Sequence, residues 1–240
     1  MNAAAHLMQV CDATWPAARV VQSGPWTLRE GRGGGKRVSA ATANTPEAAA
    51  DIPGAEAAMR ALGQRPLFQI RGEDAALDTA LAERGYAKVD PTILRAAPIA
   101  KLIDKPVPRV TAFAIWEPLA IMAEIWRAGG IGPERLAVMA RAGLKTGILG
   151  RANDKPAGVA FAGLHGETCM VHALEVLPRS RRQGVAGWMM RAAAFWAHQN
   201  GAQQMAVLVT EANRGANTLY EALGLYPVGG YHYRQSPEER

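Results

Sequence analysis

The stretch that decides the fold is His172-Ala-Leu-Glu-Val-Leu-Pro-Arg-Ser-Arg-Arg-Gln-Gly-Val-Ala186, in which a buried-looking strand runs through a basic loop into a helix. Pro178 ends the strand, and an apolar helix is expected to begin near Val185. At such a junction the free N–H groups of the first helical turn converge with the positive end of the helix dipole. Gly184 lets the backbone approach a ligand without a Cβ. The segment is therefore typical of a site that binds a diphosphate.

Outward from this junction, the apolar pattern alternates between strand and helix. In the C-terminal half we expect strands at Val110–Trp116, Thr146–Arg151, Ala157–Leu164, Thr168–Leu177, Gln204–Thr210 and Val228–Arg234. Helices are expected over Leu119–Ala142, over Val185–Gln199, and from the cap Asn213 to Leu223. In the N-terminal half we expect strands at Trp26–Arg29, Arg37–Thr42, Pro66–Arg71 and Ala87–Ala96, and helices at Pro46–Leu62 and Asp74–Arg84. The fold class is α/β.

Two halves meet at a stretch interrupted by Pro98, Pro106 and Pro108, which favour extended backbone over helix. We therefore expect one sub-domain in residues 1–100 and a second domain in residues 107–240. The loop at Gly31–Lys36 in the first half fits no phosphate-loop or dinucleotide fingerprint, and we interpret it as a hairpin turn between two strands.

An internal echo supports this division. Leu77-Asp-Thr-Ala-Leu-Ala-Glu-Arg-Gly-Tyr86 lines up with Ala216-Asn-Thr-Leu-Tyr-Glu-Ala-Leu-Gly-Leu225. The halves thus look like diverged copies. Leu81 stands where the second copy has Tyr220, and nothing before Asp74 matches the basic glycine loop, so the first half is expected to be catalytically silent.

The basic loop resembles a signature of the GNAT superfamily of acyl-CoA-dependent N-acyltransferases, Arg/Gln-x-x-Gly-x-Gly/Ala, which is met by Arg181, Gly184 and Ala186. Upstream, Glu175-Val-Leu-Pro178 looks like the splayed fourth strand of that family, and downstream Asn213-x-x-Ala-x-x-x-Tyr-Glu-x-Leu-Gly224 resembles its second conserved segment. The resemblance implies a mixed sheet flanked by helices and opened at its fourth and fifth strands. With the related, degenerate N-terminal sub-domain, the chain is similar to a tandem GNAT protein.

The resemblance further implies that acetyl-CoA is the acyl donor. Backbone groups of Leu174 and Val176 would pair with the pantetheine arm, and Asn213 and Ala216 would also contact the cofactor. The pyrophosphate would be held at the loop and the start of the helix, by Arg181, Arg182, Gln183, Gly184, Val185, Ala186 and Gly187.

Direct transfer of an acyl group to an amine needs few side chains. By resemblance, Tyr220 would face the thioester sulfur, and it can supply a proton to the leaving thiolate, while the N–H of Val176 can polarise the carbonyl. Glu175 is our first choice of general base, directly or through water, and His172 is the second. Strand alternation places Glu175 on the opposite face from His172 and Leu174. Only one of these faces can see the substrate.

Each of these residues also has a plainer interpretation. Tyr220 alone would be a half-buried helix aromatic, Glu175 a surface or paired carboxylate, and the basic loop a solvated turn. The acceptor stays open among polyamines, aminoglycosides, amino acids and protein N-termini. It is expected to touch Trp126–Arg135, and a contact with the N-terminal half stays open as well.

Composition bounds the remaining functions. The 240 residues carry a net charge of +6 and no long apolar run or signal-peptide pattern, so we expect a soluble, cytoplasmic protein without a membrane partner. Cys11 and Cys169 have no partners at ligand spacing, so neither a disulfide framework nor a metal site is expected. Basic charge favours anionic partners, and a nucleic-acid-binding protein is one alternative, although the sequence has no Lys/Arg run of the length expected for a nucleic-acid-binding arm. A non-catalytic module that binds CoA for regulation is the main alternative to an enzyme.

Overall fold

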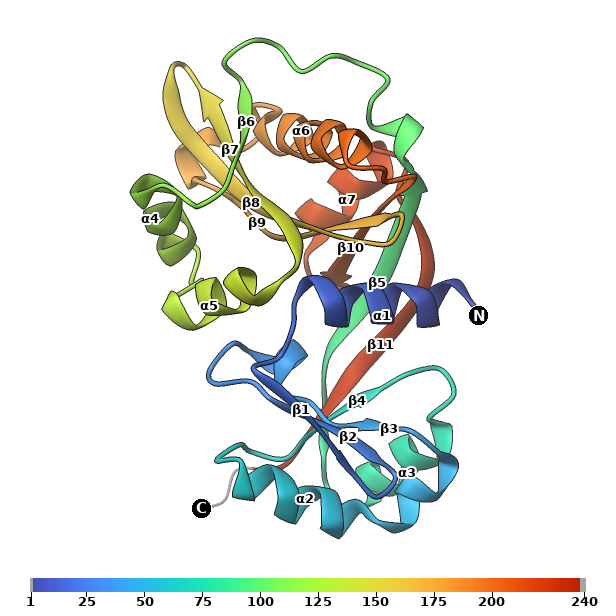
Figure 1. Ribbon diagram of the computed structural model, residues 1–240. Helices are drawn as coiled ribbons and strands as arrows, with labels where there is room; N and C mark the ends of the chain where they lie inside the picture. Colours follow the sequence, from blue (N-terminus) through green and yellow to red (C-terminus); the bar gives the residue numbers. More distant parts are fainter. Residues whose placement is uncertain (1, 238–240) are drawn as a thin grey trace. The chain divides into compact units, whose positions relative to one another are not determined.

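The computed structural model describes residues 2–237, which divide into two compact units (Figure 1). Unit 1 contains the chain up to Pro16, together with Leu94–Val209 and Asn213–Val228. Unit 2 contains Ala17–Ile93, Thr210–Ala212 and the chain from Gly229 onward. These units are not the sequential blocks 1–100 and 107–240, because the N-terminal segment belongs with unit 1 and the C-terminal segment with unit 2.

Unit 1 is built on a mixed sheet with the strand order β5-β10-β9-β8-β7-β6. Strands β6 to β9 pair antiparallel, whereas β10 is parallel to β9. The strands are β5 (Ala87–Pro98), β6 (Ala112–Ile115), β7 (Leu144–Ala152), β8 (Lys155–His165), β9 (Thr168–Val176), β10 (Gln204–Thr210) and β11 (Tyr226–Gln235), of which β5 and β11 also have residues in unit 2. The helices are α1 (Ala3–Thr14), α4 (Ala120–Ala128), α5 (Pro133–Arg141), α6 (Val185–Gln199) and α7 (Arg214–Ala222).

Glycines on the sheet let helices pack closely against both of its faces. A Cβ on Gly150 or Gly158 would lie 2.7 Å and 2.9 Å from side-chain atoms of Met189, so α6 fills one face. A Cβ on Gly163 would lie 2.7 Å from Thr14, so α1 packs on the other face. Helix α4 shares that second face, because Met122 packs against Gly147, three residues before Gly150 on the same strand. The α/β class and the mixed sheet flanked by helices are thus confirmed.

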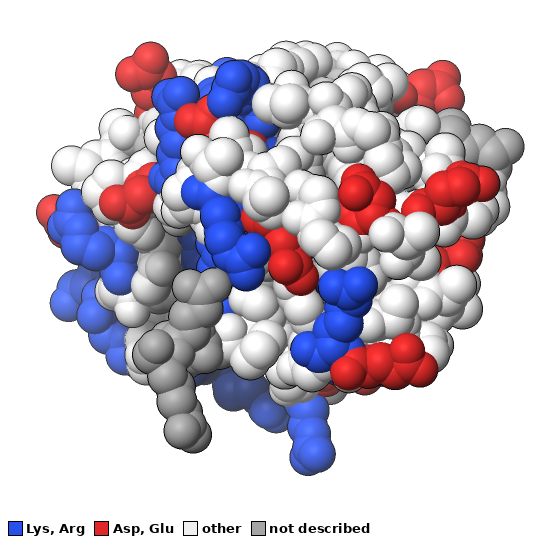
Figure 2. Space-filling model, turned by 90° about the horizontal axis from the view of Figure 1, so that it is seen from below, with Lys and Arg blue, Asp and Glu red and all other residues white. Residues whose placement is uncertain are grey.

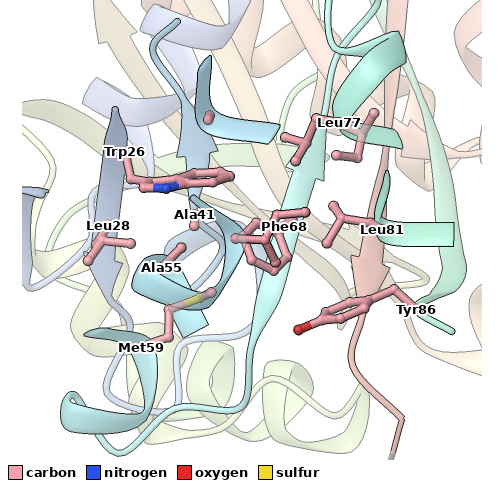
Figure 3. Close-up of a cluster of buried hydrophobic side chains, with 12 residues drawn as sticks. Trp26, Leu28, Ala41, Ala55, Met59, Phe68, Leu77, Leu81 and Tyr86 are labelled. Carbon is pink, nitrogen blue, oxygen red and sulfur yellow. The ribbon is translucent and has the colours of Figure 1, made fainter. Parts of the chain in front are cut away.

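Unit 2 holds a three-stranded antiparallel sheet of β1 (Arg19–Ser23), β2 (Trp26–Glu30) and β3 (Thr42–Ala43). It also contains α2 (Ile52–Ala61), β4 (Leu67–Ile70) and α3 (Ala75–Glu83), and β4 pairs antiparallel with the end of β11. Figure 3 shows its core, where the ring of Phe68 lies between Trp26 and Tyr86 with centroid distances of 5.2 and 5.6 Å. Met59 and Leu81 complete this core from α2 and α3.

Several expected elements of the N-terminal half are wrong. Arg37–Thr42 is not a strand but a 3₁₀ turn at Lys36–Val38 followed by the short β3, so Gly31–Lys36 is not a hairpin turn. The side-chain amide of Gln64 donates to the carbonyls of Arg29 and Ser39, so a distant side chain bridges the two segments where the expected strand pairing is missing. Helix α1 and strand β1 were not expected at all.

Two long helices expected from the sequence are each divided. Pro46–Leu62 contains a 3₁₀ turn, Pro46–Ala50, before α2 begins at Ile52. Leu119–Ala142 is split into α4 and α5 around Gly129–Gly132, with Pro133 at the first position of α5. No helix between residues 2 and 237 has the length and apolar character needed to cross a membrane.

The internal echo holds in three dimensions. Helices α3 and α7 both have nine residues, and the glycines that follow them, Gly85 and Gly224, have φ values of 79° and 77°. The chain then reverses in the same way, because the N–H of Tyr86 donates to Leu81 at 3.0 Å and that of Leu225 to Tyr220 at 2.9 Å. Only glycine adopts such a left-handed position without strain.

Candidate functional site

The sheet of unit 1 opens between β9 and β10. Their parallel ladder runs from Gln204↔Thr168 only to Val207↔Val171, although β9 continues to Val176. Beyond Val171 the edge of β9 that faces β10 leaves the ladder, and Leu174 and Val176 lie on this freed stretch. The expected opening at the fourth and fifth strands of this half is confirmed. Free strand edge is a template for an extended ligand with amide groups.

The basic loop follows β9 directly and ends at the first turn of α6. Arg182 and Gly184 have left-handed φ values of 62° and 78°, and no side chain caps the helix that starts at Val185. The N–H groups of Val185, Ala186 and Gly187 belong to this first turn, where no intrahelical acceptor exists. The side chains of Arg181, Arg182 and Gln183 are exposed around it. This arrangement fits a diphosphate, since N–H groups, helix dipole and two guanidinium groups meet at one exposed turn.

A β-bulge in β9 reorients the strand just before the loop. The register with β8 pairs His172 with Phe161 and then Glu175 with Val159, so β9 uses one residue more than β8. Ala173 takes up the extra residue with a φ of 51°, and its carbonyl accepts a hydrogen bond from Nε1 of Trp126 at 2.8 Å.

The bulge corrects one prediction about the site. Phe161 and Val159 are two residues apart on β8 and share a face, so their partners His172 and Glu175 share a face as well. The expectation that Glu175 lies opposite His172 is wrong. Simple alternation fails because it cannot count the additional residue at Ala173.

The carboxyl group of Glu175 is half-buried against the end of α4. A Cβ on Gly129 would lie 2.6 Å from Cδ of Glu175, so the absence of a side chain there makes room for the carboxylate. Burial raises the pKa of Glu175, and the positive charges of Arg181 and Arg135 oppose this shift without cancelling it. A carboxylate with a raised pKa is a stronger base than one in water.

Helix α7 follows β10, the other strand that borders the opening. Asn213 caps it as expected, since its Oδ1 accepts a hydrogen bond from the N–H of Ala216 at 3.1 Å. Tyr220 is the buried residue of this helix, with 6% of its surface exposed. The cap Asn213, the small residue Ala216 and the buried Tyr220 therefore follow one another along one short helix.

Comparison with known proteins agrees with this geometry. The model of the acetyltransferase (GNAT) family matches residues 119–225, which include α4 to α7 and the strands between them. Residues 119–225 form a GNAT domain.

The match extends to relatives along the whole chain. An uncharacterised N-acetyltransferase of Bacillus subtilis, YobR, is 27% identical over 246 residues, which cover 94% of this chain and 96% of that protein. The solved structure of a GCN5-related N-acetyltransferase from Kribbella flavida has a TM-score of 0.73 at 21% identity and covers 100% of this chain and 97% of its own. A tandem GNAT protein from the clavulanic acid biosynthesis pathway has a TM-score of 0.61 at 11% identity, over 98% and 89% of the two chains.

His172 is packed inside the GNAT domain. The hydroxyl of Thr14 donates to the carbonyl of Val10 at 2.7 Å, so its 2.8 Å contact with Nε2 of His172 must use a proton from the histidine. The imidazole also lies 5.1 Å from the ring of Trp15. This buried histidine ties α1 to β9, whereas Glu175 on the same face is only half-buried.

Three features of the GNAT domain escaped sequence reasoning: the Ala173 bulge, the bond from Trp126 that holds it, and the space left by Gly129. The glycines at 129, 130 and 132 could have indicated a close approach in that loop. Nothing in the local sequence of β9 indicates the bulge, because Ala173 is not a residue type that favours a positive φ.

Proposed function

We propose that this protein transfers an acetyl group from acetyl-CoA to a primary amine by direct attack. The observation that carries the proposal is the freed edge of β9, which leads straight into the exposed basic turn at the start of α6. An extended pantetheine arm suits the first of these features and a diphosphate suits the second.

In the proposed complex, backbone groups of Leu174 and Val176 pair with the amides of the pantetheine arm. The diphosphate is bound by the segment from Arg181 to Gly187, and Asn213 and Ala216 approach the cofactor from α7. Nε of Arg181 now donates to the carbonyl of Val176 at 3.1 Å. Binding would exchange this hydrogen bond for contacts with the pantetheine arm and with phosphate, so the guanidinium is already held beside its future partner.

The transfer then needs three groups of this chain. Glu175 takes a proton from the acceptor amine, directly or through one water molecule, while the nitrogen forms a bond to the thioester carbonyl carbon. The N–H of Val176 stabilises the oxygen of the tetrahedral intermediate. As the carbon–sulfur bond breaks, the hydroxyl of Tyr220 donates its proton to the leaving thiolate.

Catalysis in this proposal belongs to residues 107–240, whereas the related sub-domain within residues 1–100 takes no part in the chemistry. Unit 2 has Leu81 at the position of Tyr220, and this leucine is fully buried in the core. Helix α1 and the end of β5 from Leu94 are the exceptions within the first hundred residues, because both belong to unit 1. Helix α1 supports β9 through His172.

The face seen in Figure 2 gives little support to nucleic-acid binding. On the face shown in Figure 2, lysine and arginine side chains are interspersed with aspartate and glutamate and separated by uncharged surface. A phosphate backbone would favour a continuous basic stripe. The net charge of +6 is compatible with binding of one CoA molecule.

The test is a thioester-consumption screen with acetyl-CoA against a broad library of amines, run on the wild-type protein and on Tyr220→Phe. Tyr226→Phe is the matched control, since Tyr226 is 63% exposed on β11. We expect turnover with at least one amine, and a single-turnover rate for Tyr220→Phe about 10²-fold lower, at the lower end for general acid catalysis, with unchanged CoA affinity. CoA binding without turnover of any amine would instead support a regulatory module.

A further inference from the structure

Arg95 is a buried arginine whose guanidinium group donates to α7 and to the residues that follow it. It stands on β5 with 3% of its surface exposed. Its Nε donates to Oδ1 of Asn217 at 3.2 Å, its Nη1 to the carbonyl of Leu225 at 3.2 Å, and its Nη2 to Oε1 of Glu221 at 2.6 Å. A planar guanidinium that uses every nitrogen fixes direction as well as distance.

The anchors of Arg95 enclose Tyr220 on the helix. Asn217 precedes Tyr220 by one turn and Glu221 follows it directly, so the two anchors lie on either side of Tyr220 along α7. Asn217 passes the restraint on, because its Nδ2 donates to the carbonyl of the cap Asn213 at 3.0 Å. The carbonyl of Leu225 lies beyond the glycine that ends the helix. Arg95 therefore restrains α7 at its start, its middle and its end.

Unit 2 contains the same device. Nε of Arg234 on β11 donates to Oδ1 of Asp78 on α3 at 2.7 Å, and its Nη1 donates to the carbonyl of Tyr86 at 3.0 Å. In the internal echo Asp78 corresponds to Asn217 and Tyr86 to Leu225. Each copy thus uses one strand arginine to hold its helix, but only the copy in unit 1 carries a tyrosine where the other carries Leu81.

We propose that Arg95 is a positioning residue, which holds α7 so that the hydroxyl of Tyr220 stays in line with the leaving sulfur. The proposal rests on the proposed function, in which Tyr220 is the general acid. A short helix attached to a strand edge can slide or rotate by about 1 Å when an anchor is lost, and an error of this size in a reacting group can cost about 10²-fold in rate.

The first experiment reads the environment of Tyr220 without acceptor or cofactor. The chain has five tyrosines, so ring-labelled ¹³C-tyrosine gives a simple spectrum in which Tyr220→Phe identifies one signal. We expect Arg95→Lys to move the Tyr220 signal, because lysine cannot reproduce the three-point contact. The matched variant Arg234→Lys should leave that signal in place and move the signal of Tyr86. An unmoved Tyr220 signal in folded Arg95→Lys would overturn the proposal.

The second experiment connects position with rate. With the amine that gives the fastest turnover in the acetyl-CoA screen, Arg95→Lys should lower the single-turnover rate about 10-fold to 100-fold in the wild-type background. In the Tyr220→Phe background the same substitution should have little further effect, because the group that it positions is already gone. Equal losses in both backgrounds would show that Arg95 only stabilises the fold.

Should Arg95→Lys fail to fold, Glu221→Ala makes the same test from the exposed end. The side chain of Glu221 is 62% exposed, so its removal leaves the core intact while it takes away one of the three anchors. A normal rate and an unmoved Tyr220 signal in this variant would also refute the proposal. If Tyr220→Phe itself has wild-type rates, the acid role fails, while the spectrum still decides whether Arg95 sets the position of Tyr220.

Discussion

Replacing Gly129 by alanine tests whether the position of the Glu175 carboxylate matters. The new Cβ would stand 2.6 Å from Cδ and 2.9 Å from Oε2 of Glu175, whereas ordinary van der Waals contacts begin at 3.4 Å. The carboxyl group must therefore move by about 1 Å, and such a shift of a reacting group can lower a rate by about 10²-fold. The stability cost should be small, because the displaced atoms are the free end of a flexible side chain.

The assay is single-turnover acetyl transfer at saturating acetyl-CoA, with calorimetry for cofactor affinity. We expect the rate of Gly129→Ala to fall by one to two orders of magnitude while the affinity for CoA stays that of the wild type. Gly143→Ala is the control, because a Cβ at Gly143 would meet no atom within 4 Å. Wild-type rates in folded Gly129→Ala would refute the assignment of Glu175 as the general base.

Three further predictions concern charge. Because burial raises the pKa of Glu175, the charged carboxylate destabilises the folded state at neutral pH. Glu175→Gln should therefore raise the melting temperature at neutral pH, and this gain should disappear as the pH falls through the raised pKa. Thermal unfolding at several pH values measures this effect. Wild-type activity should fall on acidification, and at a higher pH than an ordinary glutamate would give. The Glu175→Gln variant should lack this activity. The double variant Arg181→Glu, Arg182→Glu should bind acetyl-CoA far more weakly than the wild type in calorimetry. The control Lys155→Glu should bind it as the wild type does. Equal affinity in the double variant, the control and the wild type would place the diphosphate elsewhere.

Sequence reasoning succeeded where local signals mark the ends of elements. The bounds of α6 and β10 agree with the prediction, because Gly184 and Gly201 punctuate that stretch. The cap of α7 was also correct, since Asn213 satisfies a backbone donor within its own turn. Signals of this kind act over a few residues, so they can be read without knowing the fold.

The parts that failed depend on distant residues. Ala173 adopts a positive φ because Trp126, from another element, holds its carbonyl, and no neighbour in β9 signals this. Helix α1 packs in unit 1 through Thr14 and His172, which lie 158 residues apart in the chain. The strands β5 and β11 begin in one unit and end in the other, which no local pattern can show. In each case tertiary contact overrides local preference.

The bulge explains how one strand can serve both substrates of the proposed reaction. Backbone groups of β9 point along the sheet toward the opening, while its side chains project from the two faces. One face is filled by α6, whose Met189 packs against Gly158. Without the extra residue at Ala173, the register would set Glu175 opposite Gly158, and its carboxylate would be buried against that apolar layer. With it, Glu175 pairs with Val159 and turns to the face that α1 and α4 cover, beside Gly129 at the end of α4. In the proposed reaction the strand edge then holds the donor, while this carboxylate serves as the base for the amine.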